Sequence, residues 1–199
     1  MRLLSIHIFK WRQENPILLG STTELSFLGF IQRRVLREHI NFNSRMICGR
    51  ANPGDRSAVH LENNQGVCYI AIHPNTFAVT VVCDPEYPQR VAFALILEII
   101  NTFLQSGIQW ESITKDTDLK FAPLETYIRQ YQNPAEADKL MRIQKELDDI
   151  TSIMHKNIEE LLKRGETLEN LMQKSQDLST VSYDFYNRAK KNNQCCKLY

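Results

Sequence analysis

Short alternating runs of apolar and polar residues dominate the beginning of the chain and predict β-strands. Runs at Leu3–Phe9 and Ile17–Ser21 flank the turn residues 13–16 and predict a hairpin. Two turn-like segments, 63–66 and 73–76, separate three further runs and predict an antiparallel meander. These three runs are Ser57–Glu62, Val67–Ile72 and Phe77–Cys83.

Spacings of three and four replace the alternation in three segments and predict helices. The first helix is capped by Ser26 and runs to about Cys48, and its apolar residues form two stripes. Either both stripes are core, or the helix keeps an apolar edge after covering a sheet. The second helix covers Gln89–Leu104 and is apolar on nearly every side, and a short third helix covers Leu124–Tyr131. The order of elements predicts one antiparallel sheet with helices packed on its faces, an α+β domain over residues 1–132.

The remaining chain has the pattern of a coiled-coil strand over residues 135–194. All seven prolines lie at or before Pro134, and Gly165 is the one glycine after it. Alternate steps of three and four define a seam in which eleven of sixteen positions are apolar. This seam predicts a long helix that needs partner helices or folds back on the first domain. Its positions are Leu140, Ile143, Leu147, Ile150, Met154, Asn157, Leu161, Arg164, Leu168, Leu171, Ser175, Leu178, Ser182, Phe185, Ala189 and Asn192.

A guanidinium at the centre of this seam is the exception to its apolar character. Burying Arg164 requires acceptors on the facing helices, and side-chain carbonyls of glutamines would supply them. Arg164 is then a register device; the alternative is an arginine that snorkels from a loosely packed position. Gly165 weakens the helix next to it by about 1 kcal/mol relative to alanine, so we expect the free strand to fold on binding.

Composition and motifs exclude several classes of function. With 24 Lys and Arg against 23 Asp and Glu, no basic field is present to gather nucleic acid. The longest apolar run, Val91–Leu97, is too short to span a bilayer, and the start lacks a signal-peptide cleavage pattern. Cys48, Cys68 and Cys83 have neither disulfide nor metal-ligand spacing. Phosphate-loop, nucleophile-elbow and zinc-protease motifs are absent, so we expect no enzyme, no metal and a cytosolic chain.

Three segments carry a resemblance to a known family. The stretch Leu161–Leu168 resembles the central arginine layer of the R-SNAREs, with Arg164 as the layer residue. Asp84–Phe93 and Gln130–Pro134 resemble the prenylated R-SNAREs that carry an N-terminal longin domain and lack a membrane span. The resemblance covers essentially the whole chain. It implies a profilin-like longin domain, with a five-stranded antiparallel sheet and helices on both faces, followed by a long coiled-coil SNARE helix.

The function that this resemblance implies is membrane fusion. The SNARE helix would join three glutamine-bearing partners, the Qa, Qb and Qc helices, in transport among endoplasmic reticulum, Golgi, endosomes and vacuole or lysosome. A trafficking adaptor or tether that binds partners without fusion is the alternative, and it would not need Arg164 at the seam centre. A redox role for Cys195 and Cys196 lacks a Cys-x-x-Cys motif.

The tail 195–199 is the candidate membrane anchor. The resemblance implies a prenyl group on Cys196 and a palmitoyl group on Cys195, with no other cofactor. Of the residues after Cys196, only Leu198 fits a prenylation box, which leaves the isoprenoid open. We expect the protein in the cytosol and, lipid-anchored, on the cytosolic faces of Golgi, endoplasmic reticulum, endosomal and vesicle membranes. In the soluble form the longin domain would cover the seam and the prenyl chain, with a groove lined by Leu36, Ile40, Phe42 and Ile47.

Overall fold

The computed structural model describes residues 1–62, 65–141 and 153–195, with side chains up to residue 137 in the fourth helix and up to 190 in the last. Strands and helices alternate in the order that the hydrophobic pattern predicts up to residue 130. The elements are β1 (Leu3–Lys10), β2 (Ile17–Thr23), α1 (Phe30–Arg50), β3 (Arg56–His60), β4 (Val67–His73), β5 (Phe77–Cys83), α2 (Gln89–Gln105), α3 (Pro123–Gln130), α4 (Pro134–Met141), β6 (Met154–Asn157), the 3-10 helix η3 (Ile158–Leu161), α5 (Leu168–Lys174) and α6 (Thr180–Cys195).

The described strands form one sheet in the order β2-β1-β5-β4-β3-β6. Strands β1 to β5 pair antiparallel, as predicted, through the β1–β2 hairpin and the β3–β4–β5 meander. The expectation of five strands is wrong by one, because β6 pairs parallel with β3. Without β6, the backbone donors and acceptors on the outer edge of β3 would lack strand partners. A segment of the predicted coiled coil therefore completes the sheet.

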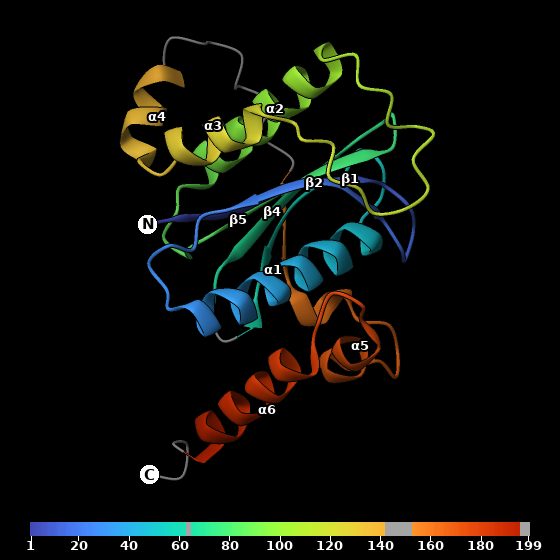
Figure 1. The fold of residues 1–199 in the computed structure, drawn as a ribbon, viewed down its shortest axis with the longest axis vertical. Helices are drawn as coiled ribbons and strands as arrows, with labels where there is room; N and C mark the ends of the chain where they lie inside the picture. Colours follow the sequence, from blue (N-terminus) through green and yellow to red (C-terminus); the bar gives the residue numbers. More distant parts are fainter. Residues whose placement is uncertain (63–64, 142–152, 196–199) are drawn as a thin grey trace. The chain divides into compact units, whose positions relative to one another are not determined.

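Helices cover both faces of the sheet (Figure 1). On one face α2 and α3 pack against inward side chains of β1, β4 and β5, in a core built around Phe77, Leu95 and Phe103, all at most 2% exposed. On the other face lies the C-terminal part of α1, residues 44–50, which buries Ile47 and Cys48. A central strand covered on both sides is buried throughout, as β5 is, and all of its residues except Thr80 are apolar.

Two local contacts fix α1 and the meander. Gly66 follows the β3–β4 turn at φ 154°, and a Cβ there would lie 2.6 Å from the carbonyl oxygen of Cys83, so only glycine fits. The end of α1 meets the β1–β2 turn, where the amide of Glu14 donates to the carbonyl of Gly49 at 3.0 Å.

The predicted start of α1 at Ser26 is wrong, since the helix begins at Phe30 after a turn whose carbonyls accept from Arg33.

The chain divides into two compact units, which cut across the predicted segments 1–132 and 135–194. One unit contains residues 1–24 and 44–161, and the other contains residues 25–43 and 162–199. Each unit therefore holds part of the sheet-and-helix region and part of the predicted coiled coil. The prediction of one long helix is wrong for this folded-back chain, because β6, η3, α5 and α6 replace it. Without partner helices, a single amphipathic helix would leave its seam in water. In the folded-back chain, seam residues such as Leu168 and Ser182 are buried by intramolecular contacts instead.

Candidate functional site

Strand β6 is the first of two places where the predicted coiled coil is bound within its own chain. It aligns with β3 in parallel register, with Ser57 opposite Met154 and His60 opposite Asn157. The backbone of β3 selects for extended conformation and not for side chains, and the Met154 side chain remains 37% exposed. After the strand, the Asn157 amide donates to the Glu160 carboxylate at 3.1 Å, and Ile158 is buried at 1% exposed.

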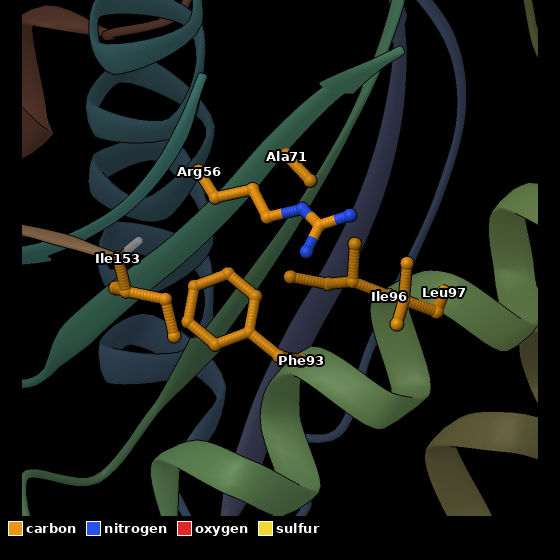
Figure 2. A pocket seen from close by; sticks show the side chains of 6 residues that line it. All are labelled: Arg56, Ala71, Phe93, Ile96, Leu97 and Ile153. Atoms are coloured by element: carbon orange, nitrogen blue, oxygen red, sulfur yellow. The ribbon is translucent and has the colours of Figure 1, made fainter. Parts of the chain in front are cut away.

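An apolar hollow adjoins β6 at the surface of α2 (Figure 2). Ile153, the residue before the strand, lines it together with Phe93, Ile96 and Leu97 of α2 and with Arg56 and Ala71 of the sheet. The Ile153 side chain is partly buried against the main core. The predicted coiled-coil segment is thus attached to the sheet domain by apolar packing as well as by backbone pairing.

The centre of the seam forms a turn. Arg164 is exposed, and Gly165 follows it at φ 83°, a left-handed conformation that other residues adopt only with strain. The turn is closed by two bonds, from the Glu166 amide to the Lys163 carbonyl at 2.9 Å and from the Lys163 amide to the Glu166 carboxylate at 2.9 Å. Arg164 therefore stays hydrated, and its predicted place in a buried polar layer remains a prediction about another state.

Two helices follow this turn in the second unit. Thr167 caps α5 by accepting from the Asn170 amide at 3.2 Å, and the helix buries Leu168 and Met172 at 6% and 2% exposed. Lys190 of α6 forms an ion pair with Glu169 of α5 and lies 5.8 Å from the centre of the Tyr186 ring. Few apolar side chains of α5 and α6 are buried, so the arrangement of the two helices depends also on the cap and the ion pair.

A carboxylate on α1 binds the beginning of α6, which is the second intramolecular attachment. Both the backbone amide and the hydroxyl of Ser179 donate to Glu38, at 2.8 Å and 2.7 Å. Ser179 Oγ in turn accepts from the amide of Ser182 at 3.3 Å, which makes Ser179 the N-cap of α6. Glu38 is also held by Arg34 at 3.0 Å. An anion at a helix N-terminus is stabilised by the unpaired amides and the helix dipole, so Glu38 fixes α6 to α1.

His39 extends this attachment by one turn of α6. Its Nε2 lies 3.2 Å from the Ser182 carbonyl oxygen, and its ring lies 5.9 Å from the ring of Tyr186. Ser182, a predicted seam position, is fully buried. A polar seam residue thus takes part in a hydrogen-bonded contact with α1.

The electrostatics of Glu38 and His39 reflect their partners. Burial would raise the pKa of Glu38, but the hydrogen bonds from Ser179, Ser182 and Arg34 outweigh it and lower that pKa to about 2. Burial lowers the pKa of His39, although the Ser182 carbonyl and the Glu38 charge oppose the shift. The folded-back state therefore favours an ionised Glu38 and a neutral His39 at pH 7.

The other predicted site residues are distributed over both units. In the predicted groove Ile40, Phe42 and Ile47 are buried at 2%, 5% and 1% exposed, and Leu36 is half-buried. Leu161, Leu171, Ser175 and Leu178 are half-buried, whereas Phe185 and Ala189 are exposed. Ile143, Leu147, Ile150 and Cys196 lie outside the described residues, as do the side chains of Leu140, Asn192 and Cys195.

The described cysteines are poor candidates for thiol chemistry. Burial raises the pKa of Cys68 to about 12 and raises the pKa values of Cys48 and Cys83 further above the ordinary range. A buried thiol that stays protonated near neutral pH is a poor nucleophile. In the part of the chain that the structure describes, no helix has both the length and the apolar character that crossing a bilayer requires.

Family comparisons match both regions of the chain. The Synaptobrevin family model matches residues 139–198, and the longin model, described as a regulated-SNARE-like domain, matches residues 26–128. Synaptobrevin homolog ykt6 of Schizosaccharomyces pombe is 38% identical over 98% of both chains, and Synaptobrevin homolog YKT6 of Saccharomyces cerevisiae is 35% identical over 98% of both. VAMP-like protein YKT61 of Arabidopsis thaliana is 34% identical over the full length of both.

The longin domain and the synaptobrevin seam define the class of protein: an R-SNARE with an N-terminal longin domain, which acts in vesicle trafficking. The chain belongs to the YKT6 family of synaptobrevin homologues. The resemblance to the longin-domain R-SNAREs is thereby confirmed, and the alternative of a tether that does not act in fusion is not favoured. Membership in a SNARE family implies SNARE partners, and the family consists of trafficking proteins.

Proposed function

We propose that this R-SNARE is lipid-anchored and inhibited by its own longin domain, and that residues 154–195 exchange between the folded-back state and one helix of a four-helix bundle. The bundle partners are a Qa, a Qb and a Qc helix. The observation that supports this best is the strand at Met154–Asn157 within a helical seam pattern. A strand rises about 3.3 Å per residue and a helix 1.5 Å, so these residues cannot be a strand of the sheet and part of a bundle helix at the same time. Bundle formation therefore requires β6 to leave β3.

The cost of release lowers the apparent affinity for partners. If only a small fraction of the protein is open, the apparent dissociation constant rises by the inverse of that fraction. The exposed turn at Arg164 fits this scheme, because the guanidinium is hydrated until glutamine carbonyls can replace water. Straightening the turn at Gly165 is part of the same transition.

Membrane attachment in this proposal is covalent, with a prenyl group on Cys196 and a reversible palmitoyl group on Cys195. One lipid chain gives marginal binding and two give stable anchoring, so acylation of Cys195 would set the balance between cytosol and membrane. The nearby Arg188, Lys190 and Lys191 favour an anionic cytosolic leaflet. The proposed locations are the cytosolic faces of Golgi, endoplasmic reticulum, endosomal and vesicle membranes, and the proposed prenyl groove contains Leu36, Ile40, Phe42 and Ile47.

The closed state is tested by placing a charge in the buried groove. Phe42→Glu should open the chain, raising both the membrane-bound fraction in cells and the helicity gained on mixing with glutamine SNAREs. Leu104→Glu is the matched control, because Leu104 is 42% exposed on α2 and its change should alter neither quantity. Equal membrane fraction and equal partner binding for wild type and Phe42→Glu would contradict the proposal.

The anchors are tested by mass measurement of the C-terminal peptide from cells. Cys196→Ser should abolish membrane association, whereas Cys195→Ser should leave weak membrane binding. An unmodified pair of thiols on membrane-bound protein would refute lipid anchoring.

The role of Arg164 is tested by fusion and not by thermal stability. Arg164→Gln keeps a polar group in the central layer and should retain more fusion than Arg164→Leu. Replacing a buried ionic layer with apolar residues is often neutral or stabilising, so melting alone cannot decide. Normal fusion with Arg164→Leu would overturn the assignment.

A further inference from the structure

Two large apolar side chains stand in water at the first turn of α1. Phe30 is 83% exposed and Ile31 is 67% exposed, the two highest values among the large apolar residues that the structure describes. Phe27, in the turn just before the helix, is 44% exposed. Adjacent exposed aromatic and β-branched side chains carry a hydration cost that marks an interaction surface.

Positive charge lies on the same side of the helix. At 100° per residue, Arg34 and Arg37 project within about 40° of Phe30. Residues 25–43 contain three arginines and one acid, Glu38, whose carboxylate is bonded to Ser179 and Arg34. The exposed apolar turn is therefore followed by a turn of net positive charge, in which Arg34 is paired with Glu38 and Arg37 is exposed.

The turn before α1 is held in place, so the apolar residues are presented in a fixed arrangement. The Arg33 guanidinium donates to the carbonyls of Leu25, Ser26 and Leu28, at 3.1, 3.1 and 3.2 Å. Three hydrogen bonds from the Arg33 side chain hold the backbone that carries Phe27 and leads into Phe30 in one conformation. A preorganised surface loses less conformational entropy when it binds.

We propose that the first turn of α1 is a membrane contact in its own right, in which Phe30 and Ile31 insert into the interfacial region of an anionic bilayer while Arg34 and Arg37 meet the lipid phosphates. Apolar side chains followed by a cationic rim match the layers of such a surface, where acyl chains lie beneath charged headgroups. A bilayer of neutral lipid would accommodate the apolar side chains but would not attract the arginines. The contact deepens the proposed membrane function, but it needs neither Cys195 nor Cys196.

The contact is weak alone and useful in combination. Two partly inserted side chains and two arginines give a reversible partition between water and bilayer, comparable with that of one lipid chain. If a prenyl group on the same molecule is already inserted in the bilayer, the α1 contact forms without a second encounter from solution. The combined affinity for the membrane then exceeds that of either contact alone. It would orient the longin domain at the bilayer while the tail holds the chain there.

The test uses the full chain with Cys195→Ser and Cys196→Ser, so that lipidation cannot contribute, and vesicles of phosphatidylcholine with and without phosphatidylserine. The double variant Phe30→Ser, Ile31→Ser should bind the anionic vesicles about tenfold more weakly in flotation. Arg37→Gln should lose about fivefold on anionic vesicles and almost nothing on neutral ones. Leu104→Ser, the matched control for loss of an exposed apolar residue, should bind as the parent does.

Tryptophan fluorescence and sedimentation distinguish insertion into the bilayer from dimerisation. In Phe30→Trp the indole emission should shift to shorter wavelength with anionic vesicles and be quenched by bromine-labelled acyl chains. An unshifted emission, or equal vesicle binding by parent and double variant, would overturn the proposal. A dimer in sedimentation that the double variant abolishes, without vesicle binding, would also overturn it and assign the surface to a second copy of the chain. Because these proteins carry no lipid, failure here leaves the anchoring proposal standing.

Discussion

The sheet core and the segment that carries α5 and α6 are stabilised in opposite ways. The core buries rings from β5, α2 and the loop after α2 against one another, with Phe77 5.3 Å from Phe103 and 5.5 Å from Trp110 between ring centres. The α6 attachment instead depends on Glu38, Ser179 and His39, and leaves Val181 and Phe185 exposed. Apolar burial across a sheet is lost only by unfolding, whereas a few hydrogen bonds can be exchanged for water at modest cost.

This contrast teaches which part of the molecule is built to change state. A switch element needs a stability of a few kcal/mol, so that a partner with differential affinity can shift its population. Hydrogen bonds to one carboxylate and one short parallel strand meet that requirement. The sheet that presents the β3 edge must in turn stay folded in both states.

The largest effect is expected in the core. Phe77→Ala removes a ring that is 0% exposed, and should lower the free energy of unfolding by about 4 kcal/mol because a cavity remains between α2 and the sheet. Urea unfolding, monitored by far-ultraviolet circular dichroism, measures this free energy of unfolding. The control Leu104→Ala, at a 42% exposed position of α2, should change that free energy by less than about 0.5 kcal/mol. A loss below about 1 kcal/mol for Phe77→Ala would mean that the core is not the rigid half of the molecule.

A smaller and local effect is expected at the α6 attachment. Glu38→Gln replaces a charged acceptor of two bonds from Ser179 with a neutral one, which should weaken the contact by about 1.5 kcal/mol and raise the open population about tenfold. Hydrogen exchange of amides in 180–190 should accelerate, while amides of β5 should keep their protection.

The matched control is Glu125→Gln, because Glu125 forms an exposed pair with Arg129 at 3.8 Å on α3. Such surface pairs contribute little, so exchange in α6 should match the wild type. If Glu125→Gln and Glu38→Gln accelerated α6 equally, the carboxylate would not be the attachment.

The smallest effect is a pH dependence of the same contact. The pKa of His39 is lowered from 6.5, so its contribution to the folded-back state is present above pH 6.5 and is lost as pH falls through the lowered value. The pKa of Glu38 is lowered from 4.5 to about 2, so its contribution is present above pH 4.5 and is lost as pH falls towards 2. Acidification should therefore loosen α6 in two steps.

Amide resonances of Ser179 and Ser182 measure these steps by NMR. Glu38→Gln should remove the step below pH 4.5, and His39→Gln should remove the step below pH 6.5. Resonances that stay constant from pH 7 to pH 3 in the wild type would show that neither group is coupled to α6.

Hydrophobic periodicity predicts the scaffold well and the folded-back state poorly. Strands β1 to β5 and helices α2 and α3 lie within two residues of the predicted bounds, because each buries a face whose period is visible locally. Met154–Asn157 follows the helical seam pattern and is nevertheless a strand, since the unpaired edge of β3 decides its conformation. A tertiary partner of this kind leaves no local signal.

The polar attachment was not predicted, although part of it had a signal. Ser179 directly before Thr180 at the start of α6 is an N-cap residue, and such a residue within a supposed continuous helix indicates a break. Gly165 beside Arg164 indicates another. Nothing in the sequence points from Ser179 to Glu38, which lies 141 residues away.

The central claim, that β6 must leave β3 before the chain can join partner helices, is tested most directly by a disulfide lock. His60 and Asn157 are directly paired and both exposed, so a His60→Cys, Asn157→Cys variant in a Cys195→Ser, Cys196→Ser background has strand spacing suited to a disulfide. Assembly with glutamine SNARE helices, followed by circular dichroism, is measured before and after reduction. The account predicts almost no bundle in the oxidised protein and full assembly after reduction; equal assembly by oxidised and reduced protein would contradict it.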